Sequence, residues 1–161
     1  MSEAEAFTYR PIGIIHSPHT DPEATPVQGV FARGVRGVVE VFPPYAAGLK
    51  DLEGFSHVYL LYHFHLSCGF SLLVKPFLDV VERGLFSTRA PRRPNAIGLS
   101  IVALKGIEGR TLHVEDVDIL DGTPLLDIKP YIKRFDEVRN PRCGWHEGID
   151  EETAARRGGR K

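Results

Sequence analysis

The chain has 161 residues, 42% of them hydrophobic, which suits one globular domain with a buried core. Its formal net charge of −1 at pH 7 gives no overall attraction to nucleic acid, so an RNA site must be a local basic patch. Because the two cysteines lack metal-type spacing and no stretch reaches membrane-spanning length, we expect a cytoplasmic protein with no membrane segment.

Short apolar segments separated by turn residues fill the first third of the chain. Residues 9–15 are apolar and β-branched and predict a first strand. Residues 19–27 lack periodicity and predict a long loop, and long loops in compact domains are often functional. Residues 30–42 alternate between apolar and polar, which predicts a strand pair or one strand broken at a glycine. Residues 45–52 fit a short helix.

Residues 55–66 give the strongest strand signal, a nearly continuous run of aromatic and aliphatic side chains. Such a strand is buried on both faces, or on one face and at a partner surface. The run carries more apolar surface than a small domain easily absorbs, so we expect a homodimer. His57, His63 and His65 share one side of a regular strand. A metal needs donors close together, and His57 lies roughly 20 Å from His63 at strand rise, so we favour core or interface histidines.

Three further strand signals follow, at residues 97–104, 111–120 and 125–128. A change of phase at Glu115-Asp116 predicts a bulge in the second of them. Asp121-Gly122-Thr123-Pro124 then predicts a turn, because it combines an Asp-Gly pair with a proline. The C-terminal half therefore has the same strand-and-turn character as the N-terminal half.

About seven short strands, little helix and many Gly and Pro turns argue for a β-barrel or a β-sandwich. No Gly-x-Gly-x-x-Gly follows a strand, which argues against a Rossmann-type fold. We assign residues 1–147 to this β domain, with a loose leader at 1–8 and a loop with some local packing at 67–83. Residues 148–161 form a charged tail that we expect to be flexible.

The stretch from residue 84 to residue 100, called the arginine loop below, stands out chemically. It contains Arg89, Arg92, Arg93 and Asn95 together with two prolines. Proline fixes φ and restrains the residue before it, so the loop should have a defined shape. Guanidinium groups bind phosphates and carboxylates bidentately and stack on planar rings. A solvated turn is the alternative, but the stiffness favours a site that grips an anion or a nucleotide.

Four blocks resemble the signature of the TsaA-like proteins, the TrmO tRNA methyltransferase family. They are PIGIIHSP at residues 11–18, GLKDLEGFSH at 48–57, FSTRAPRRPNAIGLS at 86–100 and DGTPLLDIKPY at 121–131. The resemblance runs from about residue 9 to residue 136 in family order. One departure is Ala96, where the family usually has proline.

The resemblance implies a mainly β, single-sheeted β-barrel with few short helices that binds S-adenosylmethionine. It implies dimers with the cofactor near the subunit boundary, and N6 of threonylcarbamoyladenosine at position 37 of tRNA as the methyl acceptor. The family's bacterial members often have an extra C-terminal domain that this sequence does not include, which bears on substrate choice. The cofactor contacts it implies are Gln28, Gly29, Val30, His65, Leu66, Arg89, Leu99, Asp121, Gly122, Thr123 and Pro124.

The implied reaction needs orientation and a proton acceptor. The sulfonium is already activated, so the protein must chiefly align donor and acceptor. The acceptor nitrogen is a poor nucleophile until its proton leaves, so a base or a stabiliser of negative charge would help. The modification bears a threonyl carboxylate, which makes Arg92, Arg93 and Asn95 substrate-side candidates, although Asn95 could simply cap a turn. Asp127 and Lys129 could be an acid–base pair, but we favour a structural ion pair, and the catalytic base stays unassigned.

Two other functions fit the sequence less well. One is a barrel that uses S-adenosylmethionine on a different acceptor. The other is a non-catalytic barrel that grips single-stranded RNA with basic and aromatic residues. The near-neutral charge and the cofactor-type motifs count against the second.

Overall fold

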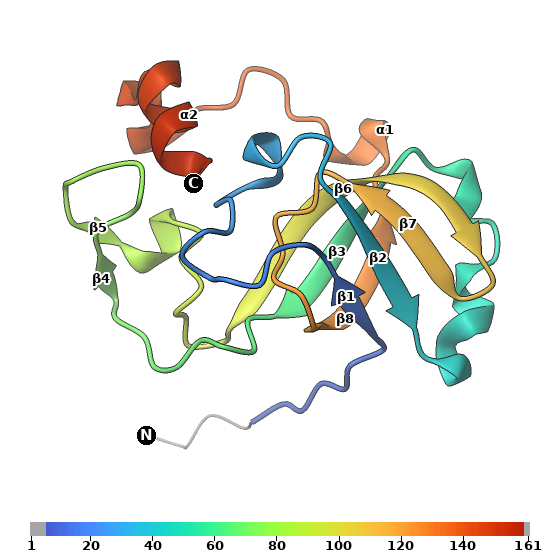
Figure 1. Cartoon of the computed structure of the whole chain (residues 1–161). Helices are drawn as coiled ribbons and strands as arrows, with labels where there is room; N and C mark the ends of the chain where they lie inside the picture. The colour runs from blue at the N-terminus through green and yellow to red at the C-terminus, as the bar shows by residue number, and fades with distance from the viewer. Residues whose placement is uncertain (1–5, 160–161) are drawn as a thin grey trace.

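A closed six-stranded antiparallel barrel forms the body of the chain (Figure 1). The computed structural model describes residues 6–159, so the first five residues of the predicted leader and the last two of the predicted tail lie outside the described residues. The strand order is β1-β2-β7-β6-β3-β8, which confirms the predicted single-sheeted β-barrel. The strands are β1 Gly13–His16, β2 Arg36–Val41, β3 His57–His63, β6 Ile97–Glu108, β7 Thr111–Glu115 and β8 Thr123–Pro130.

Short elements fill the connections. The predicted helix at 45–52 appears as two 3-10 helices, and the predicted loop at 67–83 contains the two-stranded sheet β4–β5. No helix within residues 6–159 is long and apolar enough to cross a membrane. These elements are η1 Gly29–Phe31, η2 Pro43–Leu49, η3 Leu52–Gly54, β4 Leu73–Val74, β5 Arg83–Gly84, η4 Leu85–Ser87, α1 Lys133–Asp136, η5 Gly144–Gly148 and α2 Glu151–Gly158.

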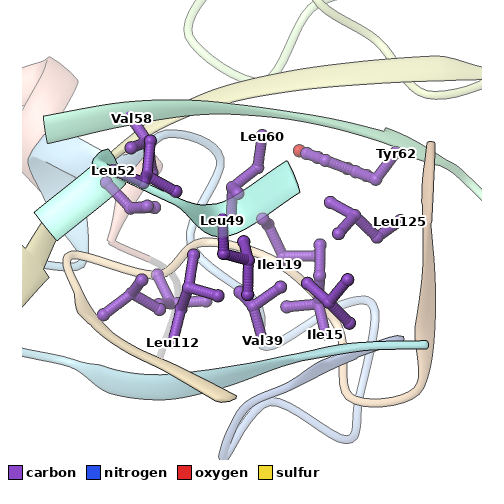
Figure 2. Packing of buried hydrophobic residues seen from close by; sticks show 14 residues of the cluster. Ile15, Val39, Leu49, Leu52, Val58, Leu60, Tyr62, Leu112, Ile119 and Leu125 are labelled. Atoms are coloured by element: carbon purple, nitrogen blue, oxygen red, sulfur yellow. The ribbon is translucent and has the colours of Figure 1, made fainter. Parts of the chain in front are cut away.

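Alternate residues of each strand point inward and form one apolar core (Figure 2). On β3, Val58 and Leu60 are fully buried while Tyr59 and Leu61 face outward and are half-buried. Side chains of opposite walls, such as Leu60 and Val39, both point into the interior. The rest of the cluster comprises Ile15, Val41, Leu49, Leu52, Tyr62, Val102, Leu112, Val114, Val117, Ile119 and Leu125.

Different segments close the two ends of the barrel. Leu49 and Leu52, from η2 and η3, cover one end. Val117 and Ile119, from the segment between β7 and β8, belong to the core at the other end. The predicted strand 111–120 stops at Glu115, because Asp116 takes a left-handed φ of 66° and its carboxylate accepts the Gly34 N–H at 2.8 Å. The phase change at 115–116 is thus a strand end, where we had predicted a bulge.

The C-terminal segment packs against the loops of the barrel. Helix α2 begins after Asp150, whose carboxylate accepts the Thr153 N–H at 2.7 Å. The Gly158 carbonyl accepts the Val27 N–H at 3.0 Å, so α2 lies against the loop before η1. Figure 1 shows α2 on the same side of the barrel as the β4–β5 sheet. The flexibility of this segment in solution stays a prediction.

Candidate functional site

Strand direction brings the predicted site loops to one end of the barrel. In an antiparallel barrel the end of one strand lies beside the start of its neighbour. His63 at the end of β3 pairs with Ile97 at the start of β6, and Tyr62 pairs with Leu125 near the start of β8. We call this end, marked by His63 and Thr123, the site end. The arginine loop leads into β6 here. The predicted turn at residues 121–124 is confined to Asp121 and Gly122, because Thr123 and Pro124 already belong to β8.

One group of predicted cofactor residues lies over the outer face of β6. Gly29 and Val30 line a cavity of ≈ 410 Å³ together with Ile101, Arg33, His57 and Asp116. A Cβ on Gly29 would lie 3.0 Å from the Asp116 carbonyl oxygen, so glycine allows this close approach. Leu99 precedes Ile101 by two residues and shares its outward face, where both are about half exposed.

A second group lies at the start of β8. His65 Nδ1 is 3.3 Å from Thr123 Oγ1, which brings the segment after β3 to the turn at 121–124. The Asp121 carboxylate accepts the Ser17 N–H at 3.2 Å and lies 3.2 Å from His16 Nδ1. These contacts anchor the turn to the end of β1. Leu66, the neighbour of His65, is exposed.

Arg89 joins the first group through Gln28. Its Nη1 donates to Gln28 Oε1 at 2.5 Å, which ties the arginine loop to the residue before η1. Its positive charge also lowers the pKa of Tyr62 and of Asp118, although burial is the dominant cause and raises both pKa values. Arg89 itself is exposed, so its charge acts on these two groups from the surface of the barrel.

A buried polar chain lies at the same end, and sequence reasoning missed it. The Tyr62 hydroxyl and Ser100 Oγ are 3.0 Å apart, and Ser100 Oγ donates to Asp118 Oδ1 at 2.6 Å. Tyr62 and Ser100 are only 5% and 6% exposed. The available signal was weak: a serine and a tyrosine at inward positions of otherwise apolar strands.

The substrate-side candidates of the arginine loop differ in their surroundings. Arg93 folds back on its own loop, where Nη1 donates to the carbonyl oxygens of Thr88 at 3.0 Å and Ala90 at 3.2 Å. Its guanidinium also lies 5.8 Å from the centre of the Phe86 ring. Arg92 and Asn95 are exposed. Arg93 thus helps to fix the loop that presents Arg92.

The three histidines have different surroundings. His57 Nδ1 lies 2.9 Å from Ser56 Oγ, and its ring contacts Tyr131 edge-on. His57 and His63 share the outward face of β3 as predicted, but β3 ends at His63, so His65 turns instead toward Thr123. In the described part of the chain, no three His, Cys, Asp or Glu side chains are grouped as a metal would require.

Asp127 and Lys129 form the ion pair that we favoured from the sequence. Lys129 Nζ lies 2.9 Å from Asp127 Oδ2, and both side chains are about half exposed. Asp127 also lines a cavity beside η2 and η3, at the end of the barrel opposite the site end. The pair is therefore distant from the cofactor candidates.

The sequence of this chain is similar to those of known proteins. Residues 14–137 match the family described as the tRNA-methyltransferase O N-terminal domain. A probable S-adenosyl-L-methionine-binding protein of Pyrococcus abyssi is 55% identical over 139 residues, which cover 86% of this chain and 76% of that protein. The tRNA (adenine(37)-N6)-methyltransferase of Mus musculus is 38% identical over 145 residues, covering 86% of this chain and 34% of the mouse protein.

A solved structure supports the same grouping. The crystal structure of TrmO from Pseudomonas aeruginosa matches with a TM-score of 0.76 and 40% sequence identity. The match covers 91% of this chain and 64% of the Pseudomonas chain. This chain therefore spans about two thirds of that relative.

Proposed function

This chain belongs to the tRNA-methyltransferase O family, and on that premise we propose that it is an S-adenosylmethionine-dependent tRNA methyltransferase. We further propose N6 of threonylcarbamoyladenosine at position 37 as the acceptor. The name of the mouse relative, tRNA (adenine(37)-N6)-methyltransferase, supports the position and the nitrogen. The threonyl group of the acceptor is a separate part of the proposal. It is supported by the exposed Arg92 of the arginine loop, because a guanidinium can bind a carboxylate bidentately.

The observation that carries the cofactor half of the proposal is the hydrogen bond from Arg89 to Gln28, which holds the arginine loop against the first group of candidates. S-adenosylmethionine has a planar adenine, ribose hydroxyls and an amino-acid end with both charges. Val30, Leu66 and Leu99 offer exposed apolar surface for the ring. Arg89 and Asp121 offer a cation and an anion for the polar groups. We assign cofactor binding to Gln28, Gly29, Val30, His65, Leu66, Arg89, Leu99, Asp121, Gly122, Thr123 and Pro124.

In this proposal the protein acts mainly by alignment. S-adenosylmethionine supplies an activated methyl group, and the chain fixes the acceptor nitrogen opposite it. Arg93 holds the arginine loop through two carbonyl oxygens, and Arg92 with Asn95 contacts the acceptor nucleotide. Nearby basic side chains contact tRNA phosphates, which makes binding dependent on salt.

Calorimetry with S-adenosylmethionine tests the cofactor site. We expect saturable binding to the wild type and about 10- to 100-fold weaker binding by Arg89→Ala, because a hydrogen bond to a charged group contributes about 1.5–3 kcal/mol. Arg110→Ala is the matched control, since Arg110 pairs with Glu40 at 2.9 Å on the outside of the barrel, away from the candidates. Folded wild-type protein that gives no heat would contradict the proposal, and so would equal binding by Arg89→Ala.

We propose that a second copy of this chain covers the apolar face beside the cofactor site. Ile97, Leu99 and Ile101 form an outward apolar row on β6 and are between 40% and 52% exposed. The segment between β3 and β6 has further exposed apolar residues, namely Leu66, Phe70, Leu72, Leu73, Val80 and Val81. Exposed apolar patches of this kind mark interfaces, and a two-fold axis lets one patch cover its own copy.

Light scattering tests the dimer. At micromolar concentration we expect a mass of twice the 17.9 kDa chain. Ile97→Asp places a charge in the row and should shift the mass toward the monomer, because a buried unpaired charge is costly. A wild-type monomer mass would contradict the dimer without affecting the proposed cofactor.

A further inference from the structure

The hydrogen bonds that link Tyr62, Ser100 and Asp118 inside the barrel all donate in one direction. Ser100 has one hydroxyl hydrogen, and it donates this hydrogen to Asp118 Oδ1 at 2.6 Å. The 3.0 Å contact with Tyr62 must then use the tyrosine hydroxyl as donor and Ser100 Oγ as acceptor. Figure 2 shows the Tyr62 hydroxyl directed over the apolar core. Both hydroxyl hydrogens therefore point along one path toward the Asp118 carboxylate.

Asp118 lies at the site end of the barrel. It lies in the segment between β7 and β8, three residues before Asp121, and its side chain is half-buried. Ser100 on β6 contacts it directly, and three groups of other segments interact with it electrostatically: Tyr62 on β3, His19 in the N-terminal loop and Arg89 in the arginine loop. Within residues 6–159 no cation lies within 4.0 Å of its carboxylate. The carboxylate is thus oriented by hydroxyls and not neutralised by a close ion pair.

We propose that Asp118 is the base that takes the proton from the acceptor nitrogen during methyl transfer, and that Ser100 and Tyr62 are its positioning residues. The inference rests on the proposed function. The nitrogen lone pair forms the new N–C bond, the S–C bond breaks, and its electron pair stays on sulfur as a thioether. The N–H proton passes to the Asp118 carboxylate, so the positive charge of the donor and the negative charge of Asp118 both disappear.

The surroundings of Asp118 act on its pKa in opposite directions. Burial raises the pKa of Asp118 in the folded chain, while the Ser100 hydrogen bond and the electrostatic interactions with His19 and Arg89 lower it. A carboxyl whose folded-state pKa is raised stabilises the fold only when protonated, and this contribution is lost as pH rises through that pKa.

The substitution Asp118→Asn tests the inference, because it keeps the shape and can still accept from Ser100. We expect methyl transfer to fall about 100- to 10,000-fold, the usual effect of losing a general base. S-adenosylmethionine binding should change little, and the thermal midpoint at neutral pH should stay the same or rise. Glu40→Gln is the matched control, since it removes a carboxylate that pairs with Arg110 outside the site.

The dependence of kcat/KM on pH distinguishes a catalytic base at Asp118 from a purely structural residue there. Wild-type kcat/KM should fall as pH drops through the raised pKa of Asp118, because the base must be ionised. Ser100→Ala should move this acid limb to higher pH, since its hydrogen bond lowers that pKa. Tyr62→Phe keeps the ring in the core and should move the limb in the same direction.

The possible outcomes are distinct. Active wild type with near-normal transfer by Asp118→Asn overturns the inference alone. Loss of folding or of cofactor binding in Asp118→Asn assigns a structural role and also overturns it. Wild type that binds S-adenosylmethionine but methylates no tRNA overturns the proposed function, and this inference with it.

Discussion

Replacing Arg92 with alanine should lower kcat/KM for tRNA methylation about 10- to 100-fold and leave S-adenosylmethionine binding intact. The side chain is exposed on a loop whose shape is fixed by two prolines and by Arg93. A charge-assisted contact with the threonyl carboxylate or a phosphate contributes about 1.5–3 kcal/mol, which sets the size of the loss. Arg93 already donates to two carbonyl oxygens, so Arg92 should account for most of the effect.

Three companion measurements sharpen this prediction. Arg92→Lys keeps the charge but loses the bidentate geometry, so it should restore only part of the activity. Added salt should weaken wild-type turnover at subsaturating tRNA, because screening acts on phosphate contacts. Arg110→Ala should behave as wild type, because Arg110 binds Glu40 and the Val41 carbonyl outside the site. Full activity in the Arg92→Ala, Arg93→Ala double variant would refute the role of the loop.

The barrel was largely predictable because its strands carry local signals. Each of the six strands falls within or overlaps a predicted apolar segment, and the turns between them hold Gly, Pro or Asp. Strand ends were less predictable, because they depend on partners far away in the chain. Asp116 ends β7 by accepting the Gly34 N–H, and no pattern near residue 116 announces that bond.

The candidate site was only partly predictable, because its contacts also depend on residues that are far apart in the chain. The resemblance named residues that the fold brings to one end, but it did not distinguish Arg92 from Arg93. That difference depends on where the Thr88 and Ala90 carbonyls lie after folding. The Asp118 chain joins three separate segments, so no single motif contains it.

The C-terminal segment contains a helix-capping pattern that its overall charged composition made easy to overlook. Its mixture of charges suggested a solvated tail, yet Asp150 is an N-cap residue followed by Glu151 and Glu152 in the first turn. Arg156 and Arg157 in the last turn complete the arrangement that the helix dipole favours. A search for capping residues would have predicted α2.

Methyl transfer to tRNA with and without threonylcarbamoyladenosine tests the central claim most directly. The wild type is incubated with labelled S-adenosylmethionine and either tRNA, and the nucleosides are then separated to locate the label. The account predicts label on N6 of threonylcarbamoyladenosine and essentially none in tRNA that lacks the modification, because the threonyl carboxylate is then missing from the contact with Arg92. Equal labelling of both tRNAs would refute recognition of the modification. Absence of label in both, with wild type that binds S-adenosylmethionine, would contradict the claim that this chain methylates tRNA.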